Sequence, residues 1–202
     1  MGQSRPRRSF ATRPSHPLMT LRSLLFLLLA PAAMAQPFET LEVGLNGAAT
    51  FGEAPYTDLW DPGLGVEGRV ETPFYLGRFT IGVTVAPHTA LGDVPDYLAL
   101  YFFGVWSADI DLPGGLRLSP GLQAGLFRMQ FDTDDAAAVR NEAELAVGPE
   151  VWLSAPLAGP WRLRAGAGAV RIFTNQRIDL RFVRVGVSRT FRTPGWLEEI
   201  LR

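Results

Sequence analysis

The stretch LEVGLNGAATF, residues 41–51, alternates apolar residues with polar or small ones along its whole length. An extended chain places the odd-numbered residues, from Leu41 to Phe51, on one face, because successive side chains of a strand point in opposite directions. Glu42 and Asn46 then fall on the other face. The same two-residue period recurs in seven further segments: 64–71, 78–85, 98–111, 116–126, 142–153, 161–169 and 183–191. The sequence therefore predicts eight β-strands and no long helix between residues 36 and 191.

Apart from Arg189 in the last segment, the charged residues of these eight segments fall on the face opposite the apolar one. Eight are acidic and six are arginines: Glu42, Glu67, Glu71, Asp109, Asp111, Glu142, Glu144 and Glu150, with Arg69, Arg78, Arg117, Arg162, Arg164 and Arg184. Phe127, Met129 and Phe131 do not fit the alternation of the fifth segment, and a β-bulge after Leu126 would restore it. We also expect bulges at Pro120 and Pro149, because proline removes a donor from the ladder.

The connections between the segments differ in length at the two ends of the predicted sheet. Short links with proline and glycine occupy residues 73–77, 112–115 and 156–160, as tight turns require. Longer acidic loops occupy residues 52–63, 87–96 and 132–140, and a fourth, brief connection occupies 175–177. An even number of segments of about 10 residues, with short turns at one end and long loops at the other, is typical of a membrane-spanning β-barrel.

Alternation alone also fits a soluble barrel with an apolar core, such as a periplasmic ligand-binding barrel of the lipocalin type. The charged face favours the membrane alternative, because it is rich in glycine, which suits a narrow packed lumen better than a solvated surface. Aromatic residues near the strand ends match an interfacial girdle: Phe51, Trp106, Trp161, Phe173 and Phe191. Lysine, which protects solvent-exposed strand edges, is absent from the chain.

The fold that we predict is all-β: a closed, antiparallel, up-and-down eight-stranded transmembrane β-barrel with a polar packed lumen and an apolar lipid-facing exterior. Closure follows because an unpaired backbone group in hydrocarbon costs several kcal/mol. Eight strands leave room inside for side chains only, so the inward charges must form a paired network. We expect Glu144 and Glu150 to pair with Arg162 and Arg164 on the next strand.

The first 35 residues are predicted to be removed on export. Residues 19–35 combine Arg22, an apolar run over residues 24–30 and the small-residue pattern at Ala33 and Ala35, which is typical of a secretory signal peptide cleaved near Ala35. The run is too short for a permanent helical anchor, the weaker alternative. Residues 1–18 are interpreted as disordered or as a mis-assigned start. Residues 36–191 form the barrel, and residues 192–202 a short amphipathic tail that lies at the membrane surface, plugs the barrel mouth or simply frays.

Composition restricts the partners of the chain. Of its 202 residues 47% are hydrophobic and 19% charged, with no cysteine, so it has ample surface for a core and no disulfides. Five of the 19 basic residues lie in the first 35 positions, and the remainder carries 14 arginines against 20 acidic residues, a net charge of about −6. This balance argues against a nucleic-acid partner.

The chain resembles the small eight-stranded outer-membrane barrels, the OmpA-like and OmpX-like transmembrane domains, over residues 40–191. The eight alternating segments, the apolar run before Ala35 and the final strand VRVGVSRTF, residues 183–191, carry this resemblance. It implies an outer-membrane location in a Gram-negative-type bacterium, with outer-membrane lipid and lipopolysaccharide around the barrel. It also implies that Phe191, which ends the last strand, is part of the signal read by the outer-membrane assembly machinery. Eleven residues follow Phe191, whereas in that family the aromatic is often the last residue.

One histidine follows the predicted cleavage site, and barrel enzymes that modify lipid A depend on a histidine with a serine and an acid. His88 has Asp93, Asp96 and Ser107 as conceivable partners. A hydroxyl nucleophile needs a base within about 3 Å, which no sequence pattern fixes. A loop histidine is more often idle, so we predict no enzyme, and the lipid A-modifying enzyme is the second alternative.

Acidic residues dominate the longer loops: Glu53, Asp58 and Asp61, then Asp93 and Asp96, then Asp132, Asp134 and Asp135, against Arg140 and Arg177. Such carboxylates suit a divalent cation that bridges to lipopolysaccharide, but the spacing at 132–135 lacks the glycine and terminal glutamate of a dedicated calcium loop. We therefore expect solvated loop charge, with no cofactor or metal. The predicted function is that of a monomeric structural or interaction protein that acts through its acidic loops or supports the envelope.

Overall fold

The computed structural model describes residues 38–54, 56–75, 77–132, 142–173, 178–196 and 199, with the side chain of Glu142 left out. The predicted signal peptide, the residues before it and most of the C-terminal tail lie outside these described residues. Among the described residues no helix is long and apolar enough to cross a membrane.

Nine strands lie within the described ranges. They are β1 (Thr40–Gly52), β2 (Gly63–Phe74), β3 (Gly77–His88), β4 (Tyr97–Ser107), β5 (Ile110–Asp111), β6 (Arg117–Phe131), β7 (Glu142–Pro156), β8 (Trp161–Ile172) and β9 (Ile178–Arg192). Two short 3-10 helices, η2 (Tyr56–Asp58) and η3 (Pro113–Gly115), lie in the connections.

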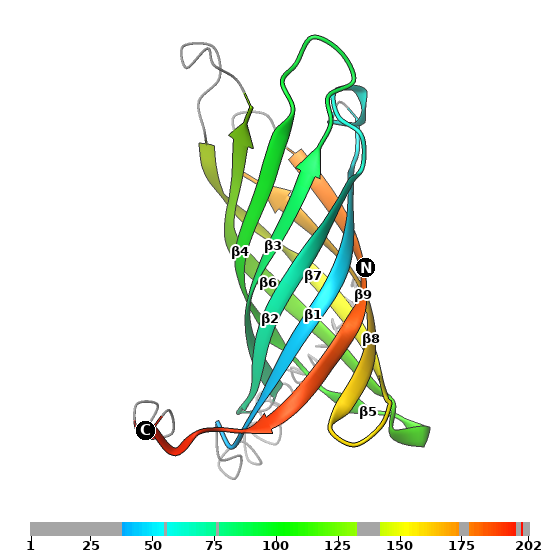
Figure 1. Cartoon of the computed structure of the whole chain (residues 1–202), viewed down its shortest axis with the longest axis vertical. Coiled ribbons are helices and arrows are strands. Elements are labelled where there is room, and N and C mark those ends of the chain that lie inside the picture. The colour runs from blue at the N-terminus through cyan, green and yellow to red at the C-terminus, as the bar shows by residue number, and fades with distance from the viewer. Residues whose placement is uncertain are drawn as a thin grey trace, which may run out of the picture. The chain divides into compact units, whose positions relative to one another are not determined.

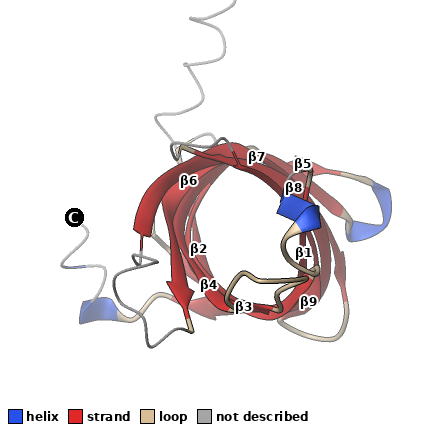
Figure 2. Cartoon of the chain, turned by 90° about the horizontal axis from the view of Figure 1, so that it is seen from above, coloured by secondary structure: helices blue, strands red, loops and turns tan. Residues whose placement is uncertain are grey.

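The strands close into one antiparallel barrel. Consecutive strands pair with each other except β4 and β5, β1 also pairs with β9, and β4 pairs with β6 (Figure 1). β5 continues β4, because Ser107 opposite Gly121 and Ile110 opposite Leu118 keep one register against β6. Figure 2 shows the resulting ring, with connecting loops lying across part of its opening. The predicted closed eight-stranded barrel is therefore confirmed, with the fourth strand interrupted at Ala108 and Asp109.

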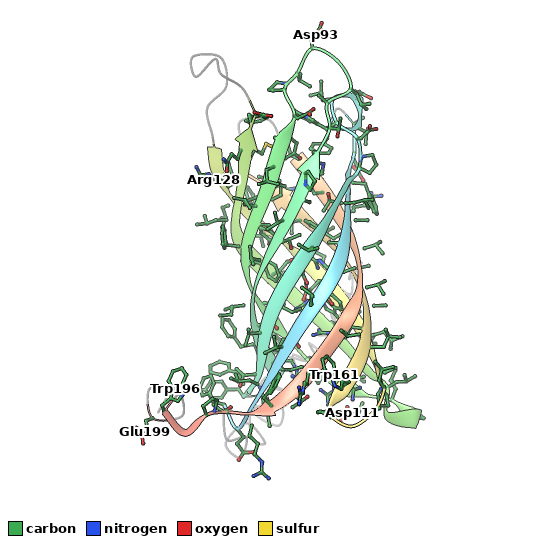
Figure 3. The ribbon with its side chains drawn as sticks, in the orientation of Figure 1. Asp93, Asp111, Arg128, Trp161, Trp196 and Glu199 are labelled. Carbon is green, nitrogen blue, oxygen red and sulfur yellow. The ribbon has the colours of Figure 1, made fainter. Side chains whose placement is uncertain are left out.

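The direction of the side chains also follows the prediction. Leu45, Leu64 and Leu122 are 65%, 74% and 59% exposed, whereas Glu67 and Arg184, on the opposite face, are completely buried. Apolar side chains therefore cover the outside of the barrel, as the sticks in Figure 3 show, and the buried charged side chains lie in its lumen. A soluble barrel with an apolar core would have the reverse arrangement.

The predicted bulge after Leu126 is wrong. β6 pairs with β4 in one register as far as Phe131, and it pairs with β7 in one register as far as Met129. Phe127 is buried inside the barrel, and Met129 and Phe131 pack against the same inner cluster, so Arg128 between them is exposed on the outside. The alternation is unbroken, because the part of the lumen that these residues enter is itself apolar.

The predicted bulges at the two prolines are also wrong. Pro120 lies opposite Val151, and Pro149 lies opposite Leu122, in an unshifted β6–β7 register. The β7–β8 ladder keeps its register on both sides of Pro149, although no pair is formed by Gly148 or Pro149 themselves. The barrel wall tolerates the missing N–H donor of a proline through a local gap in strand pairing, without the inserted residue of a β-bulge.

The two ends of the barrel are named here by their connections. The turn end carries the connections β2–β3, β4–β6 and β7–β8 and the start of β1 and the end of β9, and the loop end carries the longer β1–β2, β3–β4 and β6–β7 connections. Figure 1 shows the end of β9 at the turn end. The predicted difference in connection length between the two ends is confirmed.

Candidate functional site

An ionic layer fills the lumen in the half nearer the turn end. Arg184 Nε lies 2.7 Å from a carboxylate oxygen of Glu67, and its Nη1 lies 3.0 Å from one of Glu150. Arg69 contacts Glu150 at 2.9 Å and Glu71 at 2.7 Å. All five side chains are at least nine-tenths buried, so each guanidinium needs these carboxylates as compensation for lost hydration.

The network continues toward the turn end. Arg78 lies 3.1 Å from both Glu42 and Asp109, and Arg164 contacts Glu71. Arg117 Nη1 lies 3.5 Å from Asp109, where the network meets solvent. Five carboxylates therefore face five guanidinium groups within the described lumen: Glu42, Glu67, Glu71, Asp109 and Glu150, with Arg69, Arg78, Arg117, Arg164 and Arg184.

An inward tryptophan organises this network. The Trp152 ring has the guanidinium carbon of Arg69 4.4 Å from its centroid and that of Arg164 4.6 Å away. Its Nε1–H donates to Glu150 at 3.0 Å. Trp152 has the same parity as Glu150, so the alternation of the strand predicts that its side chain points into the lumen. No sequence pattern predicts that its ring lies between two arginines.

The predicted pairing of Glu144 and Glu150 with Arg162 and Arg164 is wrong. Glu150 pairs with Arg69 and Arg184, and Arg162 donates to Ser154 Oγ and to the carbonyl of Gly115. The register explains the difference, because Glu150 lies opposite Gly168, so its partners reach it across the lumen.

Two of the predicted lumen charges, Asp111 and Glu144, lie outside the buried part of the ionic layer. Asp111 is at the turn end with a side chain that is 82% exposed, although it remains 3.3 Å from Arg117. Glu144 is half-buried near the loop end. The side chain of Glu142 lies outside the description. Asp111 and Glu144 lie toward the two ends of the barrel, where the alternation sets the direction of a side chain but not how deeply it is buried.

The other half of the lumen, nearer the loop end, is filled by apolar side chains. Its buried residues include Tyr101, Phe103, Phe127, Ile172, Leu180 and Phe182. Tyr101 stacks on Phe103 and Phe182, with ring centroids 5.1 and 6.1 Å apart. The polar packed lumen that we predicted is therefore half polar and half apolar.

His88 closes the lumen at the loop end. Its Nε2 lies 3.0 Å from Thr50 Oγ1, and its Nδ1 lies 2.9 Å from the Tyr56 hydroxyl and 3.2 Å from the carbonyl of Asp61. The ring stacks on Tyr97 with 4.7 Å between centroids. Burial raises the pKa of Tyr56 to about 12, although its hydrogen bond with Tyr97 acts in the opposite direction. These contacts hold η2 over the barrel wall.

The arrangement does not assemble the catalytic group considered for His88. Ser107 ends β4 at the turn end, whereas His88 ends β3 at the loop end. Asp96 accepts a hydrogen bond from the backbone N–H of Ala90 at 2.7 Å, and Asp93 projects at the loop tip in Figure 3. Both nitrogens of His88 have buried partners, so the ring serves to hold the loop.

The β1–β2 and β3–β4 loops are joined into one unit, here called the double loop (residues 53–62 and 89–96). Asp61 N–H donates to the carbonyl of Thr89 at 2.9 Å, and Leu91 N–H donates to that of Leu59 at 2.8 Å. Trp60 Nε1–H donates to the carbonyl of Pro95 at 3.0 Å. These hydrogen bonds link the described parts of the two loops to each other.

The exposed surface of the double loop is acidic around a small apolar patch. Leu59 and Leu91 are 36% and 50% exposed, and the charges beside them are those of Asp58, Asp61, Asp93 and Asp96. Glu53 is already paired with Arg181. No group of three metal-ligating side chains occurs within the described ranges. Of the third predicted loop, Asp132 is exposed, and Asp134, Asp135 and Arg140 lie outside the description, as does Arg177.

Aromatic residues surround the outside near both ends. Trp106, Trp161, Phe173 and Phe191 are between 42% and 55% exposed, whereas Phe51 is half-buried. Phe191 lies on the last strand opposite Leu41 of β1, where the barrel closes. Trp196 in the tail is 64% exposed, and Leu197, Ile200 and Leu201, predicted on the same helical face, lie outside the description.

No model of a protein family and no curated protein matches the chain. Among solved structures it is similar to neisserial surface protein A, with a TM-score of 0.60 and 14% identity over 75% of this chain and 96% of that one. It is also similar to Ail, the attachment invasion locus protein of Yersinia pestis, with a TM-score of 0.52 and 11% identity over 75% of this chain and 97% of that one. The chain has the fold of the small eight-stranded outer-membrane β-barrels.

Proposed function

We propose that this protein is an outer-membrane barrel of the interaction type, which presents the acidic double loop to a positively charged partner outside the cell. The observation that carries the proposal is the fixed geometry of the double loop, whose two segments are bonded to each other and, through Tyr56 and His88, to the wall. A surface that is ordered before binding loses little entropy when a partner docks.

The location rests on three observations. The apolar exterior needs hydrocarbon around it, the segment before Ala35 has the sequence pattern of an export signal, and the fold is that of the outer-membrane barrels NspA and Ail. Both described ends of the chain would lie in the periplasm and the loops outside. The chain would insert as a monomer through the assembly machinery, with Phe191 on its final strand as part of the signal.

Charge distinguishes the proposed partner from that of a similar barrel. Ail was solved with the heparin analogue sucrose octasulfate, a polyanion. Here the exposed Asp58, Asp61 and Asp93 lie within two residues of Leu59 or Leu91 in the chain, so a polyanion would be repelled. A basic segment with apolar side chains is complementary to this surface.

The binding test uses the full barrel in lipid nanodiscs and an immobilised poly-lysine peptide, with sucrose octasulfate as the opposite probe. We expect salt-sensitive binding to poly-lysine that weakens about tenfold or more when Asp58, Asp61 and Asp93 are all changed to Asn. Asp111→Asn, at the turn end, is the matched control. Equal binding by the triple variant, or preference for sucrose octasulfate, would contradict the proposed role.

A separate test addresses the location. Membrane fractionation should recover the protein with the outer membrane, and the folded barrel should migrate differently on a gel before and after boiling. Folded protein in buffer without detergent would favour the soluble ligand carrier. Altered lipid A acylation in a His88→Ala strain would favour the enzyme.

A further inference from the structure

Arginines on the outside of the barrel differ in how their charge is compensated. Arg171 Nε lies 2.8 Å from Asp179, and Arg181 is paired with Glu53, both toward the loop end. Arg189, on β9 toward the turn end, has no carboxylate within 4.0 Å among the described side chains. Its contacts are two aromatic rings, with its guanidinium carbon 5.5 Å from the Trp161 centroid and 4.9 Å from that of Phe191.

The ladder fixes this group in place. Arg189 lies opposite Trp161 on β8, and Phe191 follows two residues later on the same face of β9. On the other side Arg189 lies opposite Val43 of β1, which is 45% exposed. The guanidinium is therefore held between two rings on an apolar wall, and ring contact leaves its edge N–H groups free to donate.

The depth of the group identifies the medium that it faces. Trp161 is the first residue of β8, next to the 157–160 turn, and Figure 3 shows it near the turn end. Thr190 N–H donates to the carbonyl of Pro160, which ties β9 to the same turn. Tryptophan at a strand end belongs to the headgroup region. The anion available at that depth is the phosphate of a membrane phospholipid.

We propose that Arg189, with Trp161 and Phe191, forms a binding site for the phosphate group of one phospholipid in the periplasmic leaflet. The guanidinium donates two parallel hydrogen bonds to two phosphate oxygens, because its planar group of N–H donors matches the spacing of those oxygens. Leu163 and Val187, which lie opposite each other and are 45% and 37% exposed, continue the same seam toward the membrane centre. They contact the acyl chain of the lipid that Arg189 holds.

Native mass spectrometry of the detergent-solubilised barrel tests this site, with phosphatidylglycerol as the probe and diacylglycerol as its phosphate-free counterpart. We expect the barrel to retain one phosphatidylglycerol and Arg189→Gln to bind it about tenfold more weakly. Arg189→Lys should restore part of the affinity, because lysine keeps the charge but not the fork. Trp161→Leu should weaken binding with Arg189 still present.

The control is Arg181→Gln, an outward arginine that already has a carboxylate partner and should leave lipid retention unchanged. A heat-dependent gel shift in each variant shows that the barrel is folded. Equal retention of both lipids, or no loss in Arg189→Gln, would overturn the proposal. So would displacement of the lipid by millimolar inorganic phosphate, because the site would then bind free phosphate without recognising a lipid.

Discussion

The two halves of the lumen are built by the same alternation but filled with opposite chemistry. Near the turn end Glu67, Arg69, Glu150 and Arg184 form a buried ion network, whereas near the loop end Phe127, Leu180 and Phe182 pack as a hydrophobic core does in a soluble protein. Burial is equal in both halves, so the difference lies in what a substitution leaves behind. Removing one charged group leaves its buried partner without a counter-charge, whereas removing one aromatic ring leaves an empty cavity.

A substitution in the ionic half should lower the free energy of unfolding the most. Glu150→Gln leaves Arg69 and Arg184 each without one of its carboxylates, and an uncompensated buried charge costs about 3–5 kcal/mol. Urea unfolding of the barrel in lipid vesicles measures the change. Asp111→Asn, at the exposed end of the network, should change stability by less than about 1 kcal/mol. Equal effects of the two variants would mean that the buried charges are solvated.

The apolar half should respond to a loss of volume. Phe182→Ala removes a completely buried ring. The cavity that it leaves should lower the free energy of unfolding by about 3 kcal/mol. Phe102→Ala, on the lipid-facing side, should cost less, because lipid chains fill the space. Unfolding in the same vesicles compares the two. A larger loss for Phe102 would place that ring in a protein core.

The ring between the arginines should have an intermediate effect. Trp152→Phe keeps an aromatic face for Arg69 and Arg164 but loses the donor to Glu150, and we expect a loss of about 1–2 kcal/mol. Trp152→Leu should cost more, because it removes the ring as well. If the two variants unfold at the same urea concentration, the ring contacts contribute nothing.

The smallest effect is expected at the loop end, and it should be local. Tyr56→Phe removes the hydroxyl that contacts His88 and Tyr97, which is worth about 1 kcal/mol. Hydrogen exchange should become faster in residues 53–62 and stay unchanged in β1 and β2. Tyr75→Phe, at an exposed position, is the control. Faster exchange throughout the barrel would show that Tyr56 supports the wall rather than the loop.

The alternation within each strand predicts the fold, because the face on which a side chain lies depends only on its position along its own strand. The parity of Leu45 and Glu67 is enough to place one outside and one inside, and closure follows from the backbone. The change from ionic to apolar filling was present in the sequence as Phe127, Met129 and Phe131, which we interpreted as a fault in the strand. The assumption that the whole lumen is polar caused that error.

The contacts within the lumen could not be predicted in the same way. Glu150 reaches Arg69 from a strand that is not its neighbour, so adjacency in the ladder gives the wrong partners. The contacts of His88 with Tyr56 and Thr50 depend on how a loop folds back over the wall, which has no periodic pattern. Arg189 is visible as a charge on the apolar face, but its two rings become adjacent only through the β8–β9 register.

The direction of the apolar face is the claim on which the others depend, and a spin label tests it. The chain has no cysteine, so Ile81→Cys and Asp93→Cys can each carry one nitroxide in vesicles. At position 81 the label should collide often with oxygen and rarely with a water-soluble nickel complex, and at position 93 the reverse should hold. A label at 81 that neither reagent reaches would place Ile81 in a protein core and contradict the transmembrane barrel.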